Sequence, residues 1–108
     1  METFKKNLLK IEQPLSFAAR DNFRNLAHIR ELGKSLSALA TSVISLIPPA
    51  AKNIFEPPLD NIARIFSDYD TSSDELKKEK INEATRIIGR LIMAADNFEA
   101  NQPIRAQQ

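Results

Sequence analysis

Four basic side chains at helical intervals are the residues of this sequence best suited to bind a charged ligand. The stretch 17–34, FAARDNFRNLAHIRELGK, contains Arg20, Arg24, Arg30 and Lys34. On a continuous helix, which turns about 100° per residue, these four positions fall within an arc of about 120°. Arginine and lysine side chains are the groups that contact the phosphates of DNA. The spacing therefore identifies these four residues as candidate phosphate contacts.

The same spacing also describes the solvent-exposed side of an ordinary helix. The opposite side of this helix carries Phe23, Leu26, Ile29, Leu32 and Leu36. Glu31 shares the basic arc, and Phe17 lies nearer the apolar side, so no aromatic ring is placed to stack on bases. We therefore interpret the arc chiefly as a solvated or domain-facing surface. Phosphate contact is the alternative, and any binding of branched DNA is expected to be weak.

The other reactive residue types do not form a recognisable catalytic site. His28 is the only histidine, and no serine has the glycine-flanked setting of a nucleophile, so we interpret His28 as an ordinary helix residue. The chain has no cysteine and only two glycines, which excludes a thiolate site and a glycine-rich phosphate loop. We expect this segment to be no enzyme and to hold no catalytic residue, metal ion, cofactor or small-molecule substrate.

The acidic stretch DYDTSSDELKKE partly fits the pattern of a calcium-binding loop. Relative positions 1, 3, 5 and 12 of such a loop are filled by Asp68, Asp70, Ser72 and Glu79. Ser73, however, stands where the loop needs a glycine for its sharp turn. Ser72 and Glu75 also fit a capping box, in which acidic residues favour a helix N-terminus. We therefore predict the start of a helix here and no calcium site.

Composition and charge bound the class of protein. The chain has 108 residues, of which 43% are hydrophobic and 27% charged, as is typical of a soluble globular domain. The N-terminus lacks the pattern of a signal peptide, and the longest apolar run, LSALATSVISLIPPA, is shorter than the roughly 18 residues of a membrane span. We expect a single cytoplasmic domain over residues 1–100, a polar tail over 101–108 and no membrane contact.

The charge is distributed unevenly along the chain. Residues 1–55 hold eight Lys and Arg against four Asp and Glu, a net charge of +4. Residues 56–108 hold seven against ten, a net charge of −3. Such asymmetry either steers a polyanion to one half or lets the two halves attract each other within one bundle.

Proline residues divide the chain into segments whose apolar residues recur every three or four positions. This pattern predicts an all-α bundle of four or five helices with near-antiparallel packing. The segment PPAAKNIFEPP, which begins and ends with a proline pair, we interpret as a connection. Gly33 favours a break within residues 14–47 over one long helix. The predicted helices cover residues 2–13, 14–32, 34–47, 57–69 and 73–99.

The last predicted helix has the most regular apolar pattern. Steps of three and four residues connect Ile81, Ala84, Ile88, Leu91, Ala95 and Phe98. This spacing is typical of the seam along which a helix packs against a nearly parallel or antiparallel neighbour. We predict that this long C-terminal helix supplies the centre of the core and that Leu91 is buried.

The stretch 13–36, QPLSFAARDNFRNLAHIRELGKSL, resembles the helical extension that precedes the wedge domain in bacterial ATP-dependent DNA helicases of the RecG type. The resemblance rests on Pro14, Leu15, Phe17, Ala18, Arg20, Asn22, Phe23, Leu26, Ile29, Leu32 and Gly33. It covers roughly a quarter of the chain, with a looser likeness in the C-terminal helix. The ATP-binding loop, the helicase motifs and the glycine-rich entry to the wedge of that family are missing from this sequence, so the resemblance implies a fragment that ends before them.

The resemblance implies an accessory helical domain that braces the wedge against the motor or touches fork DNA. Its partners are then the remaining domains of a helicase that uses ATP and magnesium to remodel stalled forks in DNA repair and recombination. No catalytic residue of the family carries over to this segment. The alternative is a free-standing interaction module that self-associates, or binds a partner helix, through the seam at residues 81–98.

Overall fold

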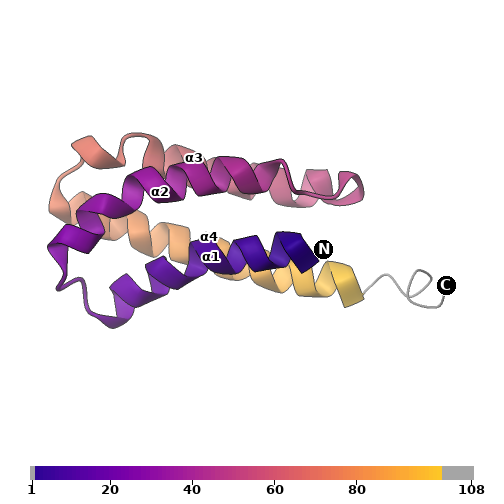
Figure 1. Ribbon diagram of the computed structural model, residues 1–108, viewed down its shortest axis with the longest axis horizontal. Coiled ribbons are helices and arrows are strands. Elements are labelled where there is room, and N and C mark those ends of the chain that lie inside the picture. Colours follow the sequence, from indigo (N-terminus) through magenta and orange to yellow (C-terminus); the bar gives the residue numbers. More distant parts are fainter. Residues whose placement is uncertain (1, 101–108) are drawn as a thin grey trace.

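A computed structural model describes residues 2–100, whose regular elements are all helical (Figure 1). The elements are α1 (Glu2–Arg20), α2 (Leu26–Ile44), the 3-10 helix η1 (Pro49–Ala51), α3 (Lys52–Ser67), the 3-10 helix η2 (Tyr69–Thr71) and α4 (Asp74–Ala100). Successive long helices run in opposite directions, with α1 beside α4 and α2 beside α3 (Figure 1). The predicted all-α bundle with a long C-terminal helix is confirmed. The predicted tail at 101–108 lies outside the described residues.

Helix α1 continues through Pro14, where we predicted a new helix to begin. Its buried side chains keep one helical stripe: Phe4, Leu8, Ile11, Leu15 and Ala18. Because proline lacks an N–H group, the helix gives up the bond that position 14 would make to the carbonyl of Lys10. The stripe offsets this loss, because the residues before and after Pro14 enter the same core. The prediction of a boundary at Pro14 was wrong for this reason.

Helix α1 ends in a turn at residues 21–25. Asn22 and Phe23 have φ angles of 55° and 58°, the left-handed conformation that often terminates helices. The N–H of Phe23 donates to the carbonyl of Ala18, and that of Asn22 to the carbonyl of Ala19, both at 3.0 Å. These paired bonds are a Schellman motif with asparagine, rather than glycine, in the left-handed position. Residues 14–47 are therefore divided between two helices, and the break lies at residues 21–25, between α1 and α2.

Helix α2 then runs without interruption through Gly33, where we predicted the break. Asn25 caps its N-terminus, because the side-chain oxygen of Asn25 accepts a hydrogen bond of 3.0 Å from the N–H of His28. Gly33 lies in the middle of the helix and is buried. The glycine thus serves a close contact with another element, described below, rather than a helix end.

Helix α3 begins inside the segment that we predicted to be a connection. It starts at Lys52 and includes Pro57 and Pro58 in its interior. Phe55 lies before the proline pair and Leu59 after it, and both are fully buried. Phe55 lies on the helical stripe that enters the core, so the apolar stripe again overrides the local cost of proline. The prediction that Pro57 opens this helix was wrong.

Helix α4 is capped by Ser73, one residue later than predicted. The N–H of Leu76 donates to the hydroxyl oxygen of Ser73 at 3.2 Å. The hydroxyl of Ser72 instead donates to the carbonyl of Asp68 at 3.0 Å. The N–H of Ser72 donates to the carbonyl of Tyr69 at 3.0 Å and closes η2. The short 3-10 turn therefore shifts the start of α4 to Asp74.

Aromatic side chains join three helices at one end of the core. The ring centroids of Phe4 and Phe55 are 5.0 Å apart, and those of Phe55 and Phe98 are 6.1 Å apart, both edge to face. On the surface nearby, Lys5 forms ion pairs with Asp96 at 2.8 Å and with Glu99 at 3.2 Å. The start of α1 and the end of α4 therefore lie together at the same end of the bundle (Figure 1).

Candidate nucleic-acid interface and surface grooves

The turn between α1 and α2 carries two of the four candidate phosphate contacts. Arg20 is the last residue of α1, and its Nε donates to the carbonyl of Ser16 at 3.4 Å. Arg24 lies in the turn itself, and both arginines are exposed. The predicted arc requires all four basic residues to lie on one continuous helix. They do not, because the turn separates Arg20 and Arg24 from α2. The predicted stripe is instead a pair at the turn and a pair on α2.

Arg30, the first basic residue on α2, is paired with the start of α4. Its Nε and Nη2 donate to the two carboxylate oxygens of Asp74 at 3.3 and 2.9 Å. These hydrogen bonds hold the pKa of Asp74 below its usual value and raise the pKa of Arg30. A guanidinium with one edge on a carboxylate has less capacity for a phosphate. Arg30 therefore serves first as a surface link between α2 and α4.

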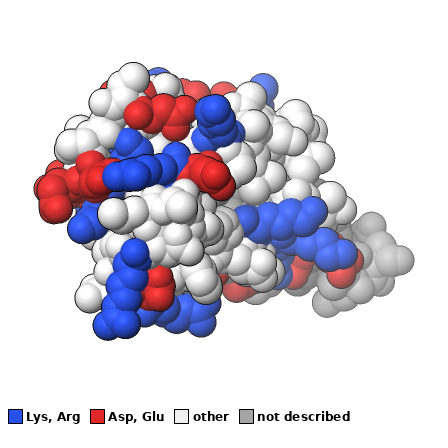
Figure 2. Space-filling view, turned by 60° about the vertical axis from the view of Figure 1, so that its left-hand side comes forward, with Lys and Arg blue, Asp and Glu red and all other residues white. Residues whose placement is uncertain are grey.

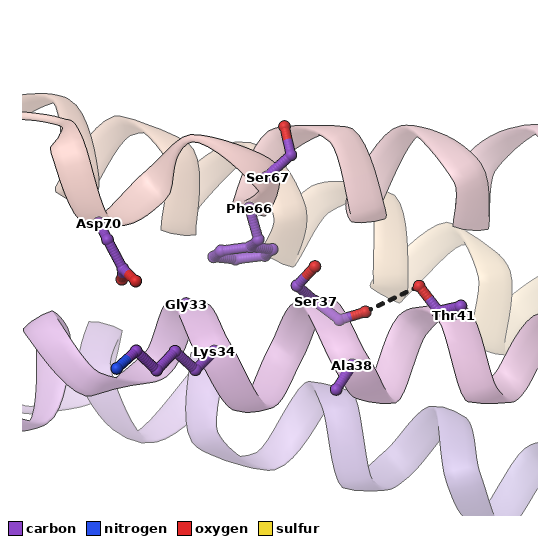
Figure 3. Close-up of a pocket in the computed structure, with 8 residues that line it drawn as sticks. All are labelled: Gly33, Lys34, Ser37, Ala38, Thr41, Phe66, Ser67 and Asp70. Carbon is purple, nitrogen blue, oxygen red and sulfur yellow. Dashed lines mark hydrogen bonds between the residues drawn. The ribbon is translucent and has the colours of Figure 1, made fainter.

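Lys34, the second basic residue on α2, borders a groove between α2 and α3 (Figure 3). The groove has a volume of about 570 Å³ and is lined by Gly33, Lys34, Ser37, Ala38, Thr41, Phe66, Ser67 and Asp70. In Figure 3 Gly33, Ser37 and Thr41 on α2 lie across the groove from Phe66 and Asp70. The Thr41 hydroxyl is already engaged, donating to the carbonyl of Ser37 at 3.0 Å. With hydroxyls, one ammonium and one carboxylate, this lining is too polar for a typical apolar ligand site.

Charges of both signs surround the basic residues at this end of the bundle. A second hollow of about 490 Å³ is lined by Arg30, Glu31, Lys34, Asp70 and Lys77. Figure 2, which brings this end forward, shows basic and acidic side chains next to one another rather than a patch of one sign. Such a surface displaces few counterions from DNA, so its phosphate contacts are expected to be weak.

A buried contact that the sequence analysis missed anchors η2 to α2. Tyr69 is fully buried, and its hydroxyl donates to the carbonyl of Ile29 at 2.5 Å. Burial raises the pKa of Tyr69 well above its ordinary value. Gly33 lies against the ring, because a Cβ atom at this glycine would stand 2.5 Å from Cδ2 of Tyr69. The only sequence signal for this contact was the rarity of the two residue types, because Tyr69 is the only tyrosine and Gly33 is one of two glycines.

Lys77 was missed for a different reason. It is only 5% exposed, and its ammonium donates to the carbonyls of Ser72 at 2.5 Å and Asp70 at 3.4 Å. The ammonium also lies 5.4 Å from the ring centroid of Tyr69. The aliphatic stem of Lys77 fills an apolar position of α4 while its head reaches backbone oxygens. A pattern that counts lysine as polar cannot detect such a residue.

The predicted packing seam of α4 faces the interior of the bundle. Ile81, Ala84, Ile88 and Ala95 are fully buried, Leu91 is 3% exposed, and Phe98 is partly buried against the core. A partner helix cannot reach these side chains unless the bundle opens. The solvent-facing side of α4 is the side that remains accessible to a partner.

The residues weighed for catalysis and for calcium take part in structural contacts. His28 packs edge-on against Phe17, with ring centroids 5.3 Å apart. Asp68 accepts a hydrogen bond of 2.9 Å from Lys80, which lowers the pKa of Asp68. Residues 69–71 form η2, and α4 begins at 74. Within residues 2–100, no group of three or more His, Asp or Glu side chains is placed to hold a metal ion.

Comparisons with protein-family models, with curated proteins and with solved structures each give no match. Over the part of the chain that the structure describes, no single helix is long and apolar enough to cross a membrane. Only α2 together with the segment 49–71 meets that criterion, and the two are bent by 109°. The function is therefore inferred from the residues and the geometry of this chain.

Proposed function

We propose that this bundle is a non-catalytic accessory domain of a RecG-like ATP-dependent DNA helicase, located ahead of the wedge domain. In this proposal the parent enzyme acts on branched DNA and stalled replication forks, and its other domains bind ATP and magnesium. The bundle contributes a docking surface for those domains and a weak contact with fork DNA.

The observation that supports this proposal is the exposure of Phe17. Phe17 belongs to the residues that resemble the helicase extension, yet it is 51% exposed, whereas Leu15 and Ala18 beside it are buried. The Phe17 ring packs edge-on against His28, and about half of its surface remains open to a neighbouring domain. A half-exposed ring close in sequence to Arg20 and Arg24 has the aromatic and arginine composition that is enriched where protein surfaces meet. This composition favours a neighbouring domain of the same protein as the main contact.

The separation of the basic residues into a pair at the turn and a pair on α2 also favours domain contact as the main role and DNA contact as the secondary one. Arg30 is held by Asp74, and Lys34 lines the same hollows as Glu31 and Asp70. Arg20 and Arg24 at the turn are then the best placed to touch a phosphate. Two such contacts contribute little affinity at physiological salt, so DNA binding is the secondary role.

The test compares the parent helicase with and without residues 1–100 in ATP-driven unwinding of a forked duplex. We expect the shortened enzyme to retain ATP hydrolysis and to lose much of its fork unwinding. Phe17→Ala in the full enzyme should reproduce part of this loss. Ile54→Ala is the matched control, because Ile54 is 49% exposed on α3 and lies outside the resembling stretch. A reading frame without helicase motifs would refute the proposal.

A further inference from the structure

Helix α4 carries a second regular pattern on its solvent-facing side. Steps of four and three residues connect Asn82, Arg86, Gly89, Met93, Asp96 and Ala100. Five of these residues are exposed, and Gly89 is half-buried. Alternating steps of three and four keep residues on one side of a helix and are the spacing with which two helices pack along each other. These six residues define the outer face of α4, a continuous side of the helix that is open to a partner.

The centre of the outer face combines an exposed side chain with a residue that has no side chain. Met93 is 67% exposed. Gly89 lies one turn earlier, and a Cβ atom added there would meet nothing within 4 Å. Packing within this bundle therefore does not require the glycine, although glycine in a helix interior is less stable than alanine. The open space beside Gly89 leaves room for a side chain from another molecule.

The two ends of the outer face carry opposite charges. Arg86 lies toward the start of α4, and within residues 2–100 no ion pair involves it. Asp96 lies toward the end of α4 and uses its Oδ1 for Lys5. The second carboxylate oxygen of Asp96 remains for another donor. The face therefore presents a cation and an anion at equal distances from its centre.

We propose that the outer face of α4 binds the same face of a second copy of this chain, with the two α4 helices antiparallel about a two-fold axis. The pairs Arg86 with Asp96 and Gly89 with Met93 share one midpoint along the helix. The axis therefore brings each arginine opposite the aspartate of the other copy and each methionine over the glycine of the other copy. A parallel pair would instead place like charges side by side.

Neighbouring residues determine the strength of this contact. Leu9 lies one helical turn beyond Lys5, which pairs with Asp96 of the outer face. Leu9 is 43% exposed. Met93 and Leu9 are the large apolar side chains that such a contact covers. This small area places the dimer in the weak, reversible class of interfaces. The inference does not depend on the helicase proposal.

The test is sedimentation velocity of the whole chain over a range of concentrations. We expect the dimer fraction of the natural chain to rise with concentration. Arg86→Asp and Asp96→Arg should each lower the association constant about tenfold or more, because each places like charges opposite one another. A one-to-one mixture of these two variants should associate again, because one face is then acidic at both ends and the other basic. Arg64→Asp on α3 makes the same charge change away from the face and should leave association unchanged.

A second variant tests the open space beside Gly89. Gly89→Gln fills it with a strong helix former, so circular dichroism should show a folded chain while association falls about tenfold. A natural chain that stays monomeric at every concentration would overturn the proposal. So would a mixture of the two charge variants that associates no better than either alone, or a Gly89→Gln chain that associates like the natural one.

Discussion

The hydroxyl of Tyr69 donates a hydrogen bond of 2.5 Å to the main-chain carbonyl of Ile29, 40 residues earlier in the sequence. The same tyrosine ring lies against Gly33 and beneath the ammonium of Lys77. These contacts fix η2, the connection between α3 and α4, against α2. The packing of one end of the bundle therefore depends on a single aromatic residue.

Tyr69→Phe removes this hydrogen bond and keeps the ring. We expect the free energy of unfolding, measured by urea denaturation, to fall by about 1 kcal/mol, the usual net contribution of such a bond. Thr41→Val is the control, because it removes an exposed hydroxyl bond of 3.0 Å to Ser37 and should change stability little. Equal effects of the two substitutions would show that the buried bond contributes nothing special.

The two glycines should respond oppositely to alanine. Gly33→Ala places a methyl group 2.5 Å from a ring carbon of Tyr69, so the ring must move, and we expect a loss of about 1–3 kcal/mol. Gly89→Ala meets no atom within 4 Å and should stabilise the helix by about 0.5–1 kcal/mol. Thermal midpoints of the two variants should shift in opposite directions. Shifts of the same sign would contradict the described packing.

Leu91→Ala should be strongly destabilising, because Leu91 is 3% exposed on the inner side of α4. Truncation of a buried leucine costs about 2–5 kcal/mol. Met93→Ala on the same helix is the comparison, because Met93 is 67% exposed and should cost less than about 0.5 kcal/mol. The assignment of the inner face fails if the two variants unfold at the same urea concentration.

Two carboxylates make stability depend on acid pH. Hydrogen bonds from Arg30 and Lys80 hold the pKa values of Asp74 and Asp68, respectively, below 3.8. The unfolded chain therefore binds more protons than the folded chain as the pH falls below about 4, and the stabilisation that is present above this pH is lost. We expect the urea midpoint to decline below about pH 4, and less steeply in a variant with Asp68→Asn and Asp74→Asn. An unchanged decline would exclude these two groups as its source.

DNA binding by the isolated bundle should be weak and only modestly dependent on salt. Fluorescence anisotropy with a forked duplex should give a dissociation constant of about 10⁻⁴ to 10⁻⁶ M at physiological salt, the range of non-specific binding. Arg20→Ala with Arg24→Ala should flatten the salt dependence further, whereas Arg30→Ala should have less effect because of its pair with Asp74. Nanomolar binding that the first variant loses would make the turn a dedicated DNA site.

The periodic pattern of apolar residues predicted the helices well, whereas single proline and glycine residues led to wrong helix boundaries. The stripe along α4 matched the buried side of that helix. Pro14, Gly33 and Pro57 suggested boundaries that the structure does not have, because burial of a continuous stripe outweighs the local cost of one proline or glycine. The true end of α1 depends on Asn22 in a left-handed conformation, which asparagine tolerates but does not require.

Of the candidate site, the sequence predicted the residue types but not their grouping. Arg30 and Asp74 are 44 positions apart, so helical spacing alone could not reveal their pair. Lys77 escaped notice because burial of a lysine depends on which carbonyls the fold brings within reach. Contacts between distant segments are set by how the helices assemble, and a local pattern does not contain that information.

The ion pairs of Lys5 with Asp96 and Glu99 hold the beginning of α1 beside the end of α4. A chain that enters and leaves a domain at neighbouring points tolerates circular permutation and insertion into the loop of a host protein. The turn between α1 and α2, at the opposite end of the bundle (Figure 1), would supply the new ends of a permuted chain. The bundle could thus be inserted into a loop of another protein through the neighbouring ends of α1 and α4. The turn between α1 and α2 would then lie far from the site of insertion.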